Sequence, residues 1–378
     1  HFLSIANQLK AESLTGEPKD AVRHASLPGS GNRRITMVLL IGSLQGSIKK
    51  RIQQMIAQGE ADLIIGTHAL LQEQVKFAKL GLAVVDEQHR FGVEQRGALT
   101  KREPRPHLLA MSATPIPRTL ALTVYGDLDI TTLKILPKGR KPITTMLANS
   151  TAAENNAYEL IRTEVAKGRQ AFVVCPLIEP SDAIEAASAL EEFEKLSIGE
   201  FKDLRVGLLH GRMKLPEKQD VMDKVRKREI DVLVATPVIE VGVDIPNATV
   251  MMIMSAQRFG LAQLHQLRGR VGRGEDESYC ILMTNSNGQT ANERIEVVLN
   301  SNDGFKLAEE DLRIRGPGDY MGTRQSGWDE LQVATIDDVD LLQIARREAS
   351  DLIADGSLDL LNANPALAKE LERVTAHH

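Results

Sequence analysis

The chain has 378 residues and a formal net charge of −5, and 26% of its residues are charged. Its two cysteines are too few for a disulfide framework, and no C-x-x-C or H-E-x-x-H spacing suggests bound zinc. No run approaches the roughly 20 apolar residues that cross a bilayer, and there is no signal-like start. We therefore expect a soluble, cytoplasmic protein without membrane contact, long enough for two domains and a tail.

Residues 1–137 alternate strand-like and helix-like segments, which is typical of an α/β domain. A helix is expected at 2–12 and a flexible insert at 26–34, where serine, glycine and proline concentrate. Short apolar stretches predict strands near 37–40, 62–65, 82–85 and 107–111. Pro137, Gly139 and Pro142 then mark a linker.

Residues 138–300 repeat this rhythm and predict a second α/β domain. Apolar stretches predict strands near 171–174, 206–209, 232–235, 250–254 and 279–283, with helices between them such as 152–167. Cys175 and Cys280 lie within apolar, strand-like stretches, so we interpret both as reduced core residues. Residues 301–378 follow as a helical appendage, in which IARREASDLIA (344–354) has helical spacing.

The first candidate site is LAVVDEQH (82–89), where a buried strand ends in two carboxylates, Asp86 and Glu87. Ligands of open parallel sheets bind at the carboxyl ends of strands. Because side chains alternate along a strand, one acid can support hydrated magnesium while the other orients or deprotonates a water. An ordinary strand end turning into a polar loop is the alternative.

A second candidate, MSATPIP (111–117), follows the next predicted strand. Its small residues Ser112, Ala113 and Thr114 can couple nucleotide state to a neighbouring surface. Alternatively, they cap a helix that begins near Arg118.

The segment QLHQLRGRVGRG (263–274) packs three arginines among glycines, a pattern that favours phosphate binding. If the stretch is helical, Gln266, Arg270 and Arg273 fall at i, i+4 and i+7 and share one face, while Arg268 points elsewhere. Guanidinium groups on a rigid element suit the stabilisation of a phosphoryl-transfer transition state. A solvated basic turn is the alternative.

Basic residues also cluster near 33–34, 49–51, 224–228 and 268–273, whereas acids concentrate at 179–200 and in the tail. A local basic track can therefore coexist with a negative total charge. Aromatic residues make up only 3% of the chain. That leaves little material for base stacking, so we expect any nucleic acid to be tracked along its backbone.

The order and spacing of these motifs resemble a superfamily 2 helicase, with ATPVIEVGVD (235–244) as a further motif. Five stretches, spread over almost the whole chain, resemble the RecG family of bacterial branched-DNA helicases more closely: DEQHRFGVEQR (86–96), MSATPIPRTLAL (111–122), VCPLIEPSD (174–182), LHGRM (209–213) and RGPGDYMGTRQSG (315–327). The resemblance implies an α/β fold of RecA-like parallel-sheet lobes of the P-loop NTPase type. An incomplete first lobe would span 1–137, a second lobe 138–300, and a translocation-motif hairpin with a C-terminal helical region 301–378.

The resemblance also implies ATP and Mg²⁺ as cofactors. Asp86 would support magnesium through water, and Glu87 would activate the attacking water. Arg270 and Arg273 would reach the γ-phosphate.

Three further residues would belong to the nucleotide site by the same resemblance: Gln266, Gly242 and Asp244. The chain departs from the family pattern at Pro237, where the family usually has threonine. That departure puts one hydroxyl contact in doubt, although Thr236 remains.

Two segments would contact DNA. Thr67 and His68, in IIGTHAL, match the family's contact with a single-strand backbone, although a satisfied loop histidine is the alternative. Asp311 begins DLRIRGPGDYMGTRQSG, which matches a helical hairpin and loop that couple motor closure to the duplex. Its matching polar positions are Arg315, Arg324 and Gln325, and a structural hairpin with surface arginines is the alternative.

A helicase of this type needs an upstream phosphate-binding loop, G-x-x-x-x-G-K-[ST], yet Gly-Lys occurs nowhere in the chain. We therefore expect a fragment that lacks the loop and the preceding wedge domain and is inactive alone. The intact enzyme would be a monomeric, nucleoid-associated bacterial helicase in recombination and repair. It would remodel replication forks and four-way junctions, with single-strand-binding protein as a further candidate partner.

Two other functions stay open. The transcription-repair coupling translocase shares the translocation motif, although it typically carries a more acidic box where this chain has Gln88 and His89. A non-catalytic nucleic-acid-binding module is also compatible with the absent phosphate loop.

Overall fold

The computed structural model describes residues 13–16, 20–26, 34–87, 105–112, 129–133, 135, 139–176, 182–237, 245–284, 289–315, 339–354, 365–366 and 368–369. The chain divides into two units, residues 1–113 and 114–378. The helix expected at 2–12 lies outside the described residues.

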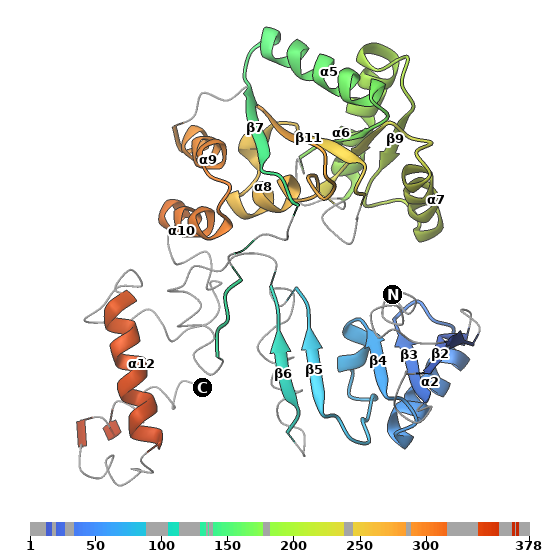
Figure 1. Ribbon diagram of the computed structural model, residues 1–378, viewed down its shortest axis with the longest axis vertical. Helices are drawn as coiled ribbons and strands as arrows, with labels where there is room; N and C mark the ends of the chain where they lie inside the picture. The colour runs from blue at the N-terminus through green and yellow to red at the C-terminus, as the bar shows by residue number, and fades with distance from the viewer. Residues whose placement is uncertain are drawn as a thin grey trace. The chain divides into compact units, whose positions relative to one another are not determined.

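Unit 1 contains a four-stranded sheet (Figure 1). Its strands lie side by side in chain order: β1 (Ser13–Thr15), β2 (Val22–Ser26), β3 (Arg34–Leu40) and β4 (Leu63–Gly66). The first three strands pair antiparallel, whereas β3 and β4 pair parallel because helix α2 (Gly46–Gln58) makes the crossover between them. Ile52 and Ile56 of α2 form one core cluster with Val38 and Leu40 of β3.

The expected flexible insert at 26–34 is corrected at both of its ends. Ser26 is the last residue of β2 and pairs with Arg34, the first residue of β3. The strand near 37–40 therefore begins earlier than predicted, and β1 and β2 were not predicted. Arg34 is exposed, so this part of β3 is held by backbone pairing, which leaves no mark in an apolar pattern.

A separate pair of parallel strands, β5 (Leu82–Val85) and β6 (His107–Ala110), completes the described strands of unit 1. Val85 lies opposite Ala110, so the two carboxyl ends are level. Both strands were predicted from their apolar runs, and their existence is confirmed. The prediction that the first of them is buried is wrong, because only Val85 of its four residues is buried. Leu82, Val84 and Leu109 are each more than half exposed among the described residues.

Unit 2 is built on a six-stranded sheet whose recorded pairings are all parallel. Its strands lie in the order β7-β12-β11-β8-β10-β9. In chain order they are β7 (Ile143–Ala148), β8 (Gln170–Val174), β9 (Val206–Leu209), β10 (Val232–Ala235), β11 (Ala248–Ile253) and β12 (Ser278–Met283). Five of these strands were predicted to within two residues at either end. The first, β7, was missed because Thr144 and Thr145 interrupt its apolar run.

The α-helices described in unit 2 are α5 (Thr151–Ala166), α6 (Asp182–Lys195), α7 (Leu215–Arg226), α8 (Leu261–Arg268), α9 (Gln289–Asn300), α10 (Gly304–Arg315) and α12 (Val339–Ala354). Those from α5 to α9 cover the two faces of this sheet, and α10 packs against α8 and α9. Helix α5 matches the predicted 152–167 to within one residue, because the Ser150 hydroxyl accepts the Ala153 N–H and caps it. The helical spacing at 344–354 is confirmed by α12.

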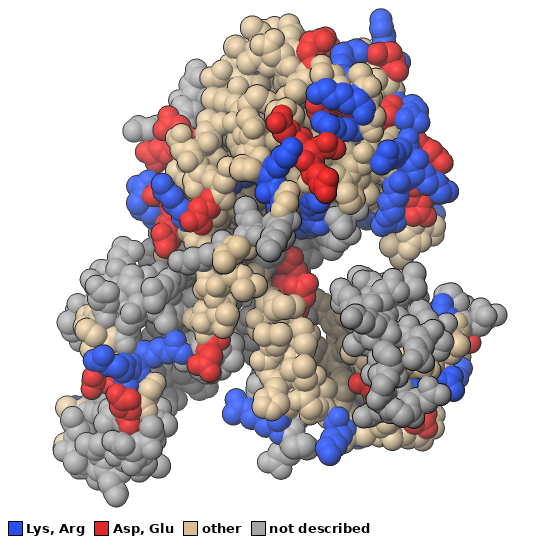
Figure 2. Space-filling view, in the orientation of Figure 1, with Lys and Arg blue, Asp and Glu red and all other residues tan. Residues whose placement is uncertain are grey.

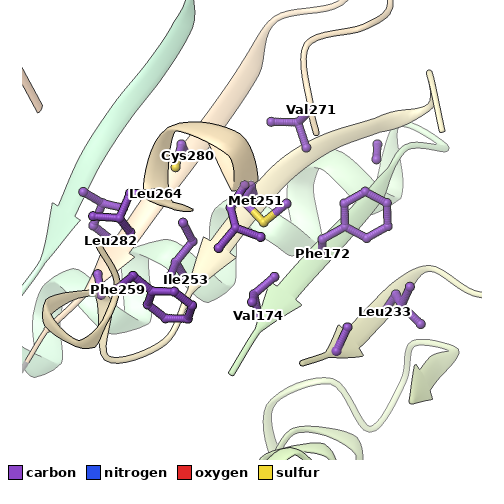
Figure 3. Close-up of a cluster of buried hydrophobic side chains, with 14 of the residues drawn as sticks. Phe172, Val174, Leu233, Met251, Ile253, Phe259, Leu264, Val271, Cys280 and Leu282 are labelled. Atoms are coloured by element: carbon purple, nitrogen blue, oxygen red, sulfur yellow. The ribbon is translucent and has the colours of Figure 1, made fainter. Parts of the chain in front are cut away.

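Alternation along the strands builds two cores. Phe172 and Val174 point to the face covered by α7, α8 and α9, whereas Ala171 and Val173 point to the face covered by α5 and α6. Figure 3 shows Phe172 and Val174 within the first of these clusters. Burial on both faces is expected for a parallel sheet and explains why its strands are nearly continuous apolar runs.

Both cysteines are buried and free, as predicted. Cys175 follows β8 and Cys280 lies within β12. Burial raises the pKa of each thiol to about 12. Neither thiol therefore ionises near neutral pH.

Shorter helical segments are described as well. A 3-10 turn, η2 (His68–Leu71), follows β4, a π-helical turn, η4 (Leu196–Glu200), follows α6, and a second 3-10 turn, η6 (Ala256–Arg258), follows β11. None of the helices in the described ranges is long and apolar enough to cross a bilayer.

Candidate functional site

The carboxyl ends of β5 and β6 bring two predicted motifs together. The Met111 N–H donates to the Val85 carbonyl at 2.8 Å, which continues the pairing one residue beyond the end of β6. Asp86 and Glu87 therefore emerge beside Ser112 at one edge of the sheet. This edge is the ligand-binding edge of parallel α/β sheets.

The backbone at Glu87 is in a conformation that L residues seldom adopt. Its φ is +53°, and its N–H donates to Asp86 Oδ1 at 2.9 Å. The bond closes a tight turn at the carboxyl end of β5. A non-glycine residue in this region costs about 1 kcal/mol or more, and such strain is concentrated at functional sites.

The donor chemistry of this edge fits a divalent cation. Asp86 is exposed and Glu87 is half-buried, so carboxylate oxygens, the preferred ligands of Mg²⁺, face the strand end. No group of three or more His, Cys, Asp or Glu side chains within the described part of the chain could hold a metal by itself. The residues therefore suit an ion that also takes oxygens from water and a nucleotide's phosphates.

Thr67 and His68 follow β4 in the same way. Thr67 donates its N–H to the Leu40 carbonyl at 3.4 Å and accepts the Leu70 N–H at 2.9 Å, which starts the η2 turn. Both side chains are exposed. Gly66 has to be glycine here, because a Cβ would overlap the Leu40 carbonyl oxygen.

The arginine-rich segment is not one continuous helix, which corrects the expected helical face. Helix α8 ends at Arg268, so Gln266 lies on the helix whereas Arg270 and Arg273 lie beyond it. Gly272 adopts a φ of +71°, which a continuing helix cannot accommodate. The i, i+4, i+7 alignment of the three side chains therefore does not exist.

Arg268 points elsewhere, as expected, but into the core. Its side chain is 2% exposed. It donates to the Val298 carbonyl at 2.8 Å and the Thr145 hydroxyl at 3.3 Å, and lies 3.2 Å from Nδ1 of His265. The guanidinium therefore joins α8, β7 and α9 and is not part of a basic surface.

His265 is neutral at physiological pH. Burial, followed by the charge of Arg268, lowers its pKa to about 4. A neutral imidazole can accept a hydrogen bond at Nδ1, which suits the neighbouring guanidinium.

The predicted basic cluster at 224–228 is also partly neutralised. Lys224 pairs with Asp220 at 2.7 Å, and Arg226 pairs with Asp223 at 2.8 Å. Figure 2 shows blue and red side chains intermixed over α7. These ion pairs are exposed and lie along one helix. They are typical of a solvated helix surface and not of a basic surface that binds phosphates.

His210, in LHGRM, is a further site candidate, which the sequence analysis did not single out. It follows β9 at the carboxyl edge of the sheet and is half-buried, and burial lowers its pKa. Its Nδ1 is buried with no hydrogen-bond partner among the described residues. A polar residue directly after an apolar strand is the signal that could have found it.

Several predicted site residues lie outside the described part of the chain. These are Ala113, Thr114, Gly242, Asp244, Arg324 and Gln325. Arg315 is the last residue of α10, and its side chain is also outside the description. Thr236 is described: it follows β10, is 1% exposed and donates its N–H to Leu209.

Comparisons with known families agree with this arrangement. Residues 22–123 match the DEAD/DEAH box helicase family, residues 153–275 match the helicase conserved C-terminal domain, and residues 301–375 match ATP-dependent DNA helicase RecG, domain 3, C-terminal.

Individual relatives give the same result. The chain is similar to an ATP-dependent DNA helicase RecG of Synechocystis, with 48% identity over 88% of this chain and 40% of the relative. It is also similar to one of Streptococcus pneumoniae, with 49% identity over 84% of this chain and 47% of the relative. A solved structure of RecG bound to a three-way DNA junction superposes with a TM-score of 0.60 and 47% identity, over 76% of this chain and 37% of that one. The chain thus spans less than half the length of the relatives it matches.

The parallel sheets, the acidic strand end and the arginine segment place the chain in the RecA-like α/β class, whose members include the helicases that it matches. Within that class, the chain belongs to the RecG family. The family's activity depends on ATP with a divalent metal.

Proposed function

We propose that this chain is part of an ATP-dependent DNA helicase and translocase that remodels branched DNA during recombination and repair. The observation that carries the proposal is the level pairing of β5 and β6, which sets Asp86 and Glu87 beside Ser112. The matching solved structure is of RecG bound to a three-way DNA junction, which supports branched DNA as the substrate.

In this proposal the acidic edge handles the nucleotide's metal and water. Asp86 holds Mg²⁺ through water, and its exposed carboxylate leaves lone pairs for that purpose. Glu87 orients and deprotonates the attacking water. When bound, the metal neutralises charge on the transferring phosphoryl group. Ser112, Ala113 and Thr114 couple this edge to the rest of the motor.

The arginine segment stabilises the transition state in the same proposal. Arg270 and Arg273 contact the γ-phosphate, and Gln266, Gly242 and Asp244 complete the nucleotide site. The loop conformation after α8 supports this role, because it carries Arg270 and Arg273 beyond the end of the helix.

DNA is held by two other sets of residues. Thr67 and His68 contact a single-strand backbone, which their exposure after β4 supports. Arg315, Arg324 and Gln325 engage the duplex.

We also propose an organisation for the motor. It has lobes at 1–137 and 138–300 with the hairpin region at 301–378, and it is monomeric. Its location is the nucleoid, and single-strand-binding protein is a further partner.

ATP hydrolysis with magnesium tests the proposal, measured on this chain and on a version extended upstream with the preceding portion of a matching relative. Turnover is expected only in the extended version, and a three-way junction should stimulate it more than a linear duplex of equal length. Glu87→Gln in the extended version should lower turnover by about 10²-fold to 10⁴-fold while junction binding persists. The matched control is Glu73→Gln, an exposed glutamate of unit 1.

Each other outcome has a definite meaning. If Glu87→Gln leaves turnover and junction unwinding intact, the role assigned to Glu87 is wrong. Absence of turnover in the extended version, with junction binding retained, would favour a non-catalytic binding module. Turnover by the chain alone would mean that other residues hold the nucleotide, and the site would have to be reassigned.

A further inference from the structure

Arg140, in the segment that precedes β7, contacts the backbone of the arginine loop, defined here as residues 269–274. Its Nε donates to the Gly272 carbonyl at 3.1 Å, and its Nη2 donates to the Gly269 carbonyl at 3.4 Å. Within the described residues, both hydrogen bonds from the Arg140 side chain go to this loop. One guanidinium therefore holds two carbonyls that are three residues apart.

The Gly269 carbonyl lies at the carboxyl end of α8, where carbonyls need a donor from outside the helix. Helix α8 ends at Arg268, and the last carbonyls of a helix have no intrahelical partner. Gly269 is the residue that caps the helix, and its carbonyl also accepts from Arg273 Nε at 3.3 Å. A cation at a helix carboxyl end is favoured by the helix dipole as well.

The loop backbone is confined at two further points. A Cβ on Gly272 would lie 2.9 Å from Cγ1 of Ile143, the first residue of β7. A Cβ on Gly274 would lie 2.9 Å from the Pro246 carbonyl oxygen, just before β11. The loop is therefore seated closely against the start of β7 on one side and the start of β11 on the other.

We propose that Arg140 is a positioning residue that sets the arginine loop so that Arg270 and Arg273 are presented from a fixed backbone. Arg140 acts through the Gly269 and Gly272 carbonyls and contacts no reacting atom. Because its segment directly precedes β7, any displacement of that segment is transmitted to the two arginines. The inference has a structural half, that Arg140 fixes the loop backbone, and a catalytic half, that this placement speeds turnover. The catalytic half rests on the function proposed above, whereas the structural half does not.

Hydrogen exchange on this chain tests the structural half. The amides of Gly269, Arg270 and Val271 donate within the turn, to His265, Leu267 and Arg268 respectively. Arg140→Ala should accelerate their exchange on the order of 10-fold relative to the unchanged protein, while amides of the sheet keep their protection. The matched control is Lys141→Ala, an exposed neighbour. Unchanged exchange in the loop would overturn the proposal.

Turnover in the extended version tests the catalytic half. Arg140→Ala should lower kcat on the order of 10-fold with KM for ATP unchanged, because misplacing a catalytic group costs rate. Arg140→Lys should restore part of that loss, since an ammonium can reach one carbonyl at a time. Arg270→Ala, the reference, should lose on the order of 10³-fold.

The two failures can be told apart. If Arg270→Ala leaves turnover unchanged, the proposed function fails, and the exchange result still decides whether Arg140 fixes the loop. If Arg270→Ala abolishes turnover but Arg140→Ala matches Lys141→Ala, the positioning role is refuted. Should Arg140→Ala fail to fold, Arg140→Gln, which keeps one donor group, provides the same comparison.

Discussion

Replacing Arg268 with alanine should destabilise unit 2, because the guanidinium is the donor for the end of α9. Val298 lies in the last turn of α9, where carbonyls lack an intrahelical donor, and Arg268 donates to it at 2.8 Å. A hydrogen bond from a charged donor contributes roughly 1.5–3 kcal/mol, and the buried acceptor left behind costs about 1–3 kcal/mol. The substitution also removes the free-energy cost of burying the guanidinium charge, which offsets part of these two losses.

A net loss of about 3 kcal/mol follows, which corresponds to a fall in Tm of roughly 6–12 °C for a unit of this size. Thermal unfolding of the chain, followed by far-UV circular dichroism, measures it. Arg226→Ala is the control, because its ion pair with Asp223 is exposed and should be worth less than about 1 kcal/mol. Arg268→Met keeps most of the side-chain volume without the charge, so its Tm should lie between those of Arg268→Ala and Arg226→Ala.

The reasoning is refuted if Arg268→Ala melts within 1–2 °C, roughly 0.5 kcal/mol, of Arg226→Ala. That result would show that the α9 end finds water or another donor. A loss in Arg268→Met equal to that in Arg268→Ala would assign the effect to hydrogen bonding and leave no part for volume.

Three further effects are expected. His265 has a pKa of about 4 in the folded chain against an ordinary 6.5, so the unfolded chain binds the proton first as pH falls. The free energy of unfolding should therefore fall by up to about 3 kcal/mol as pH drops through that window, and its dependence on pH, measured by urea unfolding, should be weaker in His265→Gln. Gly272→Ala should cost about 2–4 kcal/mol in urea unfolding because strain and a clash combine, whereas Gly168→Ala, at a φ of +79° in open space, should cost about 1 kcal/mol. Cys175 and Cys280 should resist a thiol reagent at pH 8 until urea unfolds the chain, because both are buried with pKa values of about 12.

Contradictory results are equally specific. An unchanged pH slope in His265→Gln would place the titrating group elsewhere, and equal costs for the two glycine variants would remove the close approach to β7 as a factor. Rapid labelling of either thiol in the folded chain would contradict its place in the core.

Much of the sheet architecture could be predicted from local pattern. The run at 82–85 was predicted as a strand that ends in Asp86 and Glu87, and β5 has those bounds. Short runs rich in β-branched residues favour buried strands, and this preference acts within a few residues. The second-unit strands were found for the same reason, since both of their faces are buried.

Sequence by itself therefore determined which short segments become strands and where the acids, arginines and glycines stand along the chain. It could not determine that β7 exists, because its pairing with β12 joins residues more than 130 positions apart. Tertiary structure alone decided which arginine is buried and which lie beyond the helix. Helix α8 ends at Arg268, whose side chain points inward and donates to Thr145 and Val298. Periodicity describes one helix at a time, whereas burial of a guanidinium depends on acceptors that distant segments supply.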